Sequence, residues 1–270
     1  MRILAALLAL PALLSLGCTA MQAAPRASAP LRVVSYNIKH GRGLDGRVDL
    51  DRTRDVLRAL DADVVLLQEV DEVCERSGGV DQARALGDAL GMEARFCSFM
   101  DYQGGRYGLA LLSALPVEGW ARIDLPDGTD EPRAALGVVV VAPGGQRVRI
   151  VNCHLDWKSD PARRIAQARV PRAALEEGAD AVDRTLLGGD VNARIGSPAL
   201  GVFTEGAGGF ERLGPDAPTF PADVPDRTID HFLVLPPGRD AAEVSVVDEA
   251  LASDHRPVVL EVRFGDGGGR

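Results

Sequence analysis

The residues that could carry chemistry form short polar motifs, each at the end of an apolar run. Asn37 lies near the end of the run 31–38, and Glu69 closes the run 63–69. An ionised carboxylate beside such an apolar segment is costly unless it is paired or bound to a metal ion. Taken alone, Asn37 is typical of a turn and Glu69 of a solvated surface, so these two motifs gain meaning only with the rest of the chain.

A histidine with polar neighbours forms the next motif. The two-residue period of a strand places Asn152, His154 and Asp156 on one face and Cys153 on the other. A histidine on a polar face suits proton transfer, and a hydrogen-bonded structural histidine is the alternative interpretation. Cys153 belongs to the apolar face, where we expect a small core residue and not a nucleophile.

Two glycines precede the pair Asp190 and Asn192. Their flexible backbone allows a tight turn, and the i, i+2 spacing then presents both side chains on the same side. Such a pair suits holding and orienting a water molecule. An ordinary turn at the end of a strand is the alternative, because Gly, Asp and Asn are all turn formers.

Two motifs near the end of the chain combine an acid with a histidine. Asp230-His231 leads into an apolar run, and Asp254-His255 precedes the last one. A carboxylate near an imidazole favours the charged form of the imidazole. Three of the four histidines of the chain, including His154, lie inside these motifs. This clustering favours a common functional site over background placement.

The elements that must position these residues are mostly short strands. Alternating apolar patterns separated by Gly, Pro and Asp predict strands at 31–38, 63–69, 94–99, 107–113, 116–123, 134–142, 147–155, 185–189, 229–235, 243–248 and 257–263. So many closely spaced strands favour two packed sheets.

Helical spacing appears in three places. Leu50, Thr53, Leu57 and Leu60 share one face, as do Ala83, Leu86 and Leu90, and a third helix is expected at 161–177. Pro161 suits the first turn of that helix, whereas Pro171 should kink or break it. We expect these helices to cover the sheets.

In order and type, the motifs resemble those of the endonuclease/exonuclease/phosphatase superfamily, the deoxyribonuclease I-like metal-dependent phosphoesterases. The resemblance covers about residues 31 to 263. Its pieces are Tyr36-Asn37-Ile38, Gln68-Glu69-Val70, the run from Tyr107 to Ser113, His154-Leu155-Asp156, the run from Gly188 to Asn192, the run from Ile229 to Phe232, and the run from Ser253 to Pro257. Each piece alone is unspecific, but their common order is a specific signature.

The resemblance implies an α+β fold, a four-layer α/β/β/α sandwich. Two mixed, mostly antiparallel sheets would pack face to face with helices outside. It also implies that Glu69 is the principal ligand of a Mg²⁺ or Mn²⁺ ion, with Asn37 and Asp254 near it. Oxygen ligands of this kind are what hard divalent ions prefer.

The resemblance further implies catalytic roles. Asp190 would orient and deprotonate the attacking water, and Asn192 would hold Asp190 or a phosphate oxygen. Asp230 would orient His255 and keep it cationic, while His154 would donate to a non-bridging oxygen. Asp190 is the preferred proton acceptor, with His255 as the alternative. One departure stands out: many members have Asn where this chain has Leu109, which puts a phosphate contact there in doubt.

The chain ends predict an exported protein. Residues 1–17 read as a signal peptide whose apolar stretch is too short to span a membrane. The residues before Cys18 resemble a bacterial lipobox, and an ordinary cleavage between Ala20 and Ala24 is the alternative. An Ala/Pro-rich tether at 18–30, a phosphoesterase domain at 31–264 and a Gly-rich tail at 265–270 would follow. We expect a periplasmic or membrane-anchored lipoprotein, or otherwise a secreted protein.

Composition narrows the substrate. The formal net charge is −9, and the sequence has no dense Lys/Arg cluster, which argues against nucleic acid as a partner. We therefore expect a phosphate ester in a lipid head group or a small phosphorylated metabolite. A secreted nuclease and a non-catalytic binding protein on the same fold are the alternatives.

Beyond Cys18 the cysteines are Cys74, Cys97 and Cys153, an odd number that cannot all pair. We expect a monomer.

Overall fold

The structure is a computed structural model that describes residues 29–128, 130–177, 181–206, 208–238 and 240–265. The predicted signal peptide, Cys18, most of the tether and most of the tail lie outside these residues. None of the helices within these ranges is long and apolar enough to cross a membrane. Cys74, Cys97 and Cys153 are all buried and free.

In the described residues, twelve strands form two sheets of six. The strands of the first sheet are β1 (Leu31–Asn37), β2 (Val64–Glu72), β3 (Glu93–Tyr102), β4 (Gly105–Ser113), β11 (Asp240–Val246) and β12 (Val258–Phe264). The strands of the second are β5 (Val117–Asp124), β6 (Ala134–Val141), β7 (Arg147–His154), β8 (Arg184–Asp190), β9 (Glu211–Leu213) and β10 (Asp230–Leu235). The strand orders are β11-β12-β1-β2-β4-β3 and β5-β6-β7-β8-β10-β9.

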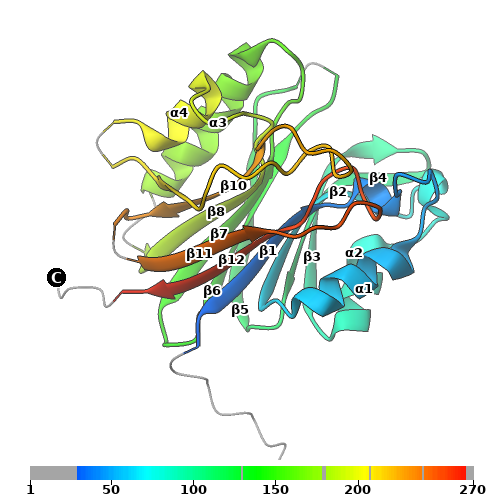
Figure 1. Cartoon of the computed structure of the whole chain (residues 1–270), viewed down its shortest axis with the longest axis horizontal. Coiled ribbons are helices and arrows are strands. Elements are labelled where there is room, and N and C mark those ends of the chain that lie inside the picture. Colours follow the sequence, from blue (N-terminus) through cyan, green and yellow to red (C-terminus); the bar gives the residue numbers. More distant parts are fainter. Residues whose placement is uncertain (1–28, 129, 178–180, 207, 239, 266–270) are drawn as a thin grey trace, which may run out of the picture.

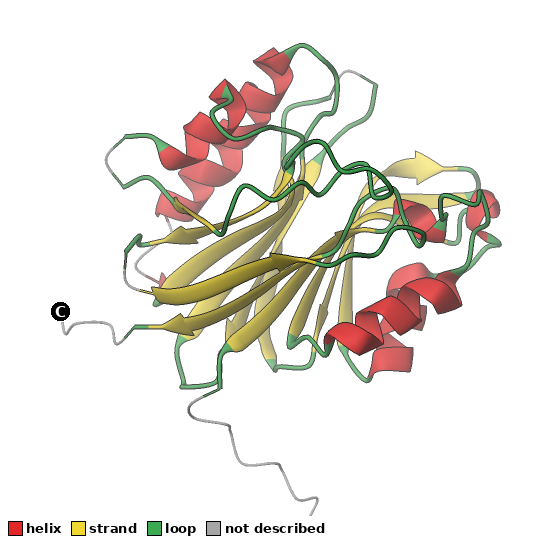
Figure 2. Ribbon diagram, viewed as in Figure 1, coloured by secondary structure: helices red, strands yellow, loops and turns green. Residues whose placement is uncertain are grey.

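Helices cover the outer face of each sheet (Figures 1 and 2). They are α1 (Leu50–Leu60), α2 (Gln82–Leu90), α3 (Pro161–Glu177) and α4 (Pro198–Thr204), with short 3-10 turns η1 (Lys39–Gly41) and η2 (Glu75–Ser77). The first two pack on the first sheet, and α3 and α4 pack on the second. Among the strand pairs in the described part of the chain, only β1/β2 and β7/β8 are parallel. The predicted four-layer sandwich of mostly antiparallel sheets is confirmed.

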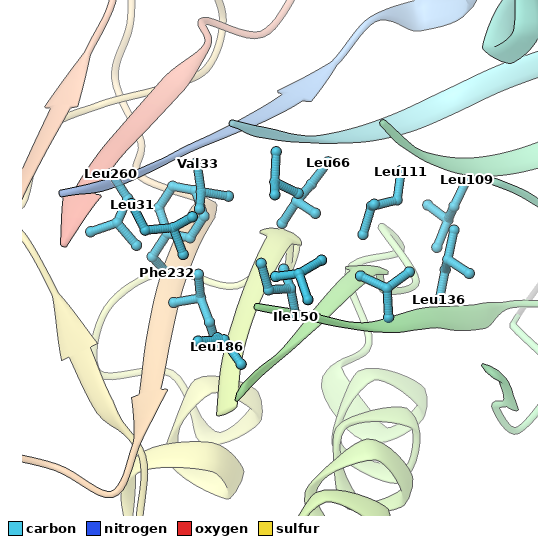
Figure 3. Close-up of a cluster of buried hydrophobic side chains, with 14 of the residues drawn as sticks. Leu31, Val33, Leu66, Leu109, Leu111, Leu136, Ile150, Leu186, Phe232 and Leu260 are labelled. Atoms are coloured by element: carbon cyan, nitrogen blue, oxygen red, sulfur yellow. The ribbon is translucent and has the colours of Figure 1, made fainter. Parts of the chain in front are cut away.

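The main core lies between the sheets, where Leu31, Val33 and Leu260 face Leu186 and Phe232 (Figure 3). The next residues along β1 point the other way, toward α1 and α2, as the two-residue period of a strand predicts. Burial of apolar area at all three interfaces between the four layers stabilises the sandwich. Pro171 lies inside α3, which runs on through it and does not break.

Strand register brings several polar motifs to one edge of the sandwich. In the second sheet Asp190, at the end of β8, lies beside His154 of β7 and Asp230 of β10. In the first sheet Asn37 is paired with the residue that precedes Glu69. Because β1 and β2 are parallel, as are β7 and β8, the carboxyl ends of each pair meet at the same edge.

Candidate active site

Glu69 is directed toward the site by an irregularity in β2. The pairing of β2 with β4 shifts between Leu67 and Val70, and Glu69 itself has a left-handed backbone with φ of 56°. A bulge of this kind commonly re-aims a side chain beside an active site. The Asn37 amide donates to Glu69 Oε1 at 3.0 Å. Burial, reinforced by the charge of Asp254, raises the pKa of Glu69.

Asp190 lies at the centre of the polar cluster and is almost fully buried. Its Oδ2 accepts from the Asn37 amide at 3.2 Å and lies 3.5 Å from Nε2 of both His154 and His255. Its Oδ1 accepts from the backbone N–H of Asn192 at 2.9 Å. Burial and the nearby charge of Asp230 raise the pKa of Asp190 to about 7. This carboxylate therefore links the first sheet to both histidines.

His255 is held by a buried carboxylate on its far side. Its Nδ1 lies 3.0 Å from Asp230 Oδ2, which also accepts from the Thr219 hydroxyl at 2.5 Å. Burial opposes the charged imidazolium, but Asp230 and Asp190 outweigh it and raise the pKa of His255 to about 10. Phe220 covers the ring at a centroid distance of 4.8 Å. Nothing in the pattern of the loop before β10 marks Thr219 or Phe220 as part of a site.

His154 has the opposite electrostatic character. It is 3% exposed, and burial together with the charges of Arg133 and His255 lowers the pKa of His154 well below its usual value. Nδ1 has no hydrogen-bond partner among the residues described. A neutral imidazole can still donate one N–H, which is what the predicted contact to a non-bridging oxygen requires.

Two predicted site residues have unexpected partners. Asp254 forms an ion pair with Lys39, which follows directly on the motif of Asn37. The side chain of Asn192 donates to the carbonyl of Leu155 at 3.0 Å and so fixes the loop after β7. The eight predicted residues thus lie in one connected region, with Asn37 and Asp230 buried behind the others.

Other polar residues of the same motifs belong to the scaffold. The buried His231 ring nitrogen Nε2 contacts the carbonyl of Ala193 at 2.8 Å. Asn152 crosses to the first sheet, where its amide donates to the carbonyls of Leu67 and Ala110, both at 2.9 Å. These are structural roles, which the sequence left undistinguished from catalytic ones.

The donor set fits a hard divalent cation on the side of Glu69. Glu69 and Asp254 supply carboxylate oxygens, the ligands that Mg²⁺ and Mn²⁺ prefer. Asn37 lies beside Glu69, and its amide oxygen accepts from the backbone N–H of Lys39 at 3.1 Å. A second group, Asp190, Asp230 and His255, brings potential ligand atoms within 4.8 Å of one another. There, however, Asp230 Oδ2 is already engaged by Thr219 and His255. That group is better suited to a hydrogen-bonded relay than to an ion.

A pocket of about 750 Å³ opens over these groups. Its floor contains Glu69, His154, Asp190, Asn192, Asp254 and His255. Basic side chains outnumber acidic ones in its lining, and they are Arg76, Arg133, Lys158, Arg164, Arg194 and Arg227. Arg76 lies in the short turn η2 and Arg133 in the loop before β6, where no periodic pattern distinguishes them from surface arginines.

Comparisons with known proteins identify similar sequences and folds. A family model described as the Endonuclease/Exonuclease/phosphatase family matches residues 34–255. The uncharacterized protein YbhP of Escherichia coli strain K12 is 26% identical over 252 residues, which span 86% of this chain and 96% of that protein.

Solved structures show the same fold. An endonuclease/exonuclease/phosphatase from Bacteroides vulgatus has a TM-score of 0.71 at 19% identity, covering 87% of this chain and 98% of the other. A mannosyl-6-phosphatase from Bacteroides thetaiotaomicron has a TM-score of 0.69 at 20% identity, covering 87% and 100%.

Proposed function

The chain belongs to the endonuclease/exonuclease/phosphatase family, and from this membership we propose that it is a divalent-metal-dependent hydrolase of phosphate esters. The observation that carries the proposal is the position of Asp190. One carboxylate oxygen lies 3.5 Å from two histidines and is joined through Asn37 to Glu69. A water-activating group, cationic and neutral donors and a metal-ligand set are thereby assembled around one pocket.

Glu69 and Asp254, with the amide oxygen of Asn37, would hold the cation. When bound, it would polarise the phosphoryl group and stabilise negative charge on the leaving oxygen. The buried surroundings of Glu69 make its bare carboxylate costly, as the raised pKa of this group indicates. A cation at this position would remove that cost.

We assign the water's proton to Asp190. With a pKa near 10, His255 is protonated at neutral pH and cannot accept a proton, whereas Asp190, with a pKa near 7, can. The water oxygen attacks phosphorus, its proton passes to Asp190, and the ester P–O bond opposite breaks. The leaving alkoxide is protonated by solvent. His255 and His154 donate to the phosphoryl oxygens, on which charge builds up in the transition state.

The test measures release of nitrophenol from p-nitrophenyl phosphate and from bis-p-nitrophenyl phosphate in the presence of Mg²⁺. Asp190→Asn and His255→Ala should each lower kcat/KM by about 10²-fold or more, and a chelator should abolish the reaction. Asp88→Asn, on the exposed face of α2, is the matched control and should leave the rate unchanged. Equal rates in wild type and Asp190→Asn would refute the role assigned to Asp190, and no Mg²⁺-dependent release by wild type would favour a non-catalytic binding protein.

For the substrate we propose a lipid head group or a small phosphorylated metabolite. The acidic balance of the chain supports this choice over a long nucleic acid, since a polyanion would have to lie along the outer surface. Rapid cleavage of single- or double-stranded DNA in the same assay would identify a nuclease instead. We expect the hydrolase to act as a monomer, which light scattering on the eluted protein can measure.

Export and anchoring through Cys18 are a further part of the proposal and rest on the sequence alone. Cys18→Ser should move the protein from the membrane fraction to the soluble fraction and abolish incorporation of labelled palmitate. Two acyl chains hold a protein firmly, whereas the Ala/Pro-rich tether alone has no affinity for lipid. Soluble, unlabelled wild-type protein would instead indicate ordinary signal cleavage.

A further inference from the structure

Arg133 is a buried cation with two guanidinium nitrogens that lack a hydrogen-bond partner among the described residues. The residue is 3% exposed, and it lines the catalytic pocket. One nitrogen pairs with Glu131 at 2.9 Å, but Nε and Nη1 have no hydrogen-bond partner in the described part of the chain. Its guanidinium packs over the ring of Phe99, 5.2 Å from the ring centroid. Unsatisfied buried guanidinium donors are costly, and because Arg133 lines the pocket, a ligand there that accepts hydrogen bonds would remove this cost.

Arg76 lines the same pocket and is held rigidly in place. Its Nε and Nη2 donate to the two carboxylate oxygens of Asp71 at 2.8 and 2.7 Å. Asp71 is fully buried, and its own backbone N–H is bound by the side chain of Gln82. A bidentate pair of this kind fixes the plane of the guanidinium, and Arg76 has further N–H groups that this pair does not use.

Tyr107 joins the two arginines. The guanidinium of Arg76 lies 5.1 Å from its ring centroid, and 4.5 Å from that of Tyr102. Arg133 is close enough on the other side to act on the pKa of Tyr107, which burial raises well above its usual value. Tyr107 therefore keeps its proton and can donate it in a hydrogen bond. Arg133 lines the same pocket as Glu69 and His154.

We propose that Arg76, Tyr107 and Arg133 form an anion subsite next to the reacting phosphoryl group, and that the preferred substrate carries a second phosphate or a carboxylate. The proposal rests on the phosphate-ester hydrolase activity proposed above and names its substrate class. Rigid arginines suit this task, because their planar donors match the oxygens of phosphate and carboxylate.

The experiment compares sugar phosphates that differ in the second anionic group. Release of inorganic phosphate is measured with Mg²⁺ for glucose 6-phosphate, glucose 1,6-bisphosphate and 6-phosphogluconate. We expect kcat/KM to be more than tenfold higher for at least one of the two substrates with a second anionic group than for glucose 6-phosphate, mainly through a lower KM. The bisphosphate and the gluconate then separate a phosphate from a carboxylate requirement. Equal kcat/KM for all three would overturn the subsite.

Arg76→Gln should remove this preference, so that the substrates with and without a second anion react with similar kcat/KM. Arg76→Lys keeps the charge but lacks the planar, two-pronged guanidinium, and it should retain part of the preference. Arg84→Gln, a highly exposed arginine on α2, is the matched control and should keep the wild-type ratio. A ratio unchanged in Arg76→Gln would contradict the assignment, because a merely structural defect would slow all substrates alike.

Loss of Arg76 alone leaves Asp71 buried and unpaired, which could unfold the protein. The double variant Asp71→Asn/Arg76→Gln removes both charges and should lose the preference in the same way. Inorganic phosphate without metal should raise the Tm of wild type but not of Arg133→Met, and an equal rise in both would also overturn the subsite. Absence of any Mg²⁺-dependent ester hydrolysis would instead refute the hydrolase itself.

Discussion

Asp190 Oδ2 and His255 Nε2 are 3.5 Å apart, yet the surroundings of the two side chains give them different protonation states near neutral pH. Burial makes Asp190 reluctant to ionise, while two carboxylates keep His255 charged. Pairs of titratable groups whose environments set their pKa values apart often mark the acid and the base of a site. His154, buried without a carboxylate on its Nδ1, completes the set as a neutral donor.

This arrangement predicts a bell-shaped dependence of kcat/KM on pH. The rate should rise as Asp190 loses its proton near pH 7 and fall as His255 loses its proton near pH 10. Asp230→Asn removes a charge that raises the pKa of His255, so the alkaline limb should move to lower pH. An alkaline limb that stays in place in Asp230→Asn would show that another group controls it.

The sequence predicted the polar residues that end strands, because position after an apolar run is a local signal. It did not predict Thr219, Phe220 or Arg133, which come from loops without periodicity and reach the site only through the tertiary fold. Nor did it predict that Lys39 would pair with Asp254. That contact joins positions far apart in the chain, and no local pattern encodes it.

At the scale of elements, the bulge in β2 is secured from the opposite sheet. Asn152 of β7 donates to the carbonyls of Leu67 and Ala110, the last pair before the register shift. The side-chain oxygen Oδ1 of Asn152 accepts from the side-chain amide of Gln68 at 2.7 Å. The side-chain amide of Asn152 in the second sheet therefore satisfies backbone carbonyls of the first sheet at the bulge that orients Glu69.

Asn152→Leu should destabilise the protein by about 2 to 4 kcal/mol, because two buried carbonyls and the Gln68 amide lose their partner in a site of similar volume. Urea unfolding measures the change. Activity should fall as well, since a relaxed bulge no longer holds Glu69. Wild-type stability in Asn152→Leu would mean that the bulge is held by the strands alone.

The prediction of elements succeeded where the pattern was long and failed where it was short. The helix at 161–177 was predicted at its observed bounds, but the expected break at Pro171 is absent, because packing of this helix on the second sheet favours continuity. The three-residue β9 carries too few residues for an alternating signal. The start of α4 is marked in the sequence by Ser197 before Pro198, although this short helix has no periodic pattern that predicts it.

At the scale of the whole molecule, the net charge of −9 conceals a basic pocket. The cations of the lining are scattered from Arg76 to Arg227 and gather only when the two sheets pack together. For this reason the sequence shows no basic cluster. An acidic exterior around a cationic pocket favours small anionic esters over long polyanions, in agreement with the proposed substrate class.

The central claim is that both sheets meet around one divalent cation held by Glu69. Crystals soaked in Mn²⁺ and measured for anomalous scattering test it directly. A peak is expected beside the carboxylates of Glu69 and Asp254 in wild type, and no peak in crystals of Glu69→Gln. A peak among Asp190, Asp230 and His255, or none at all, would contradict it.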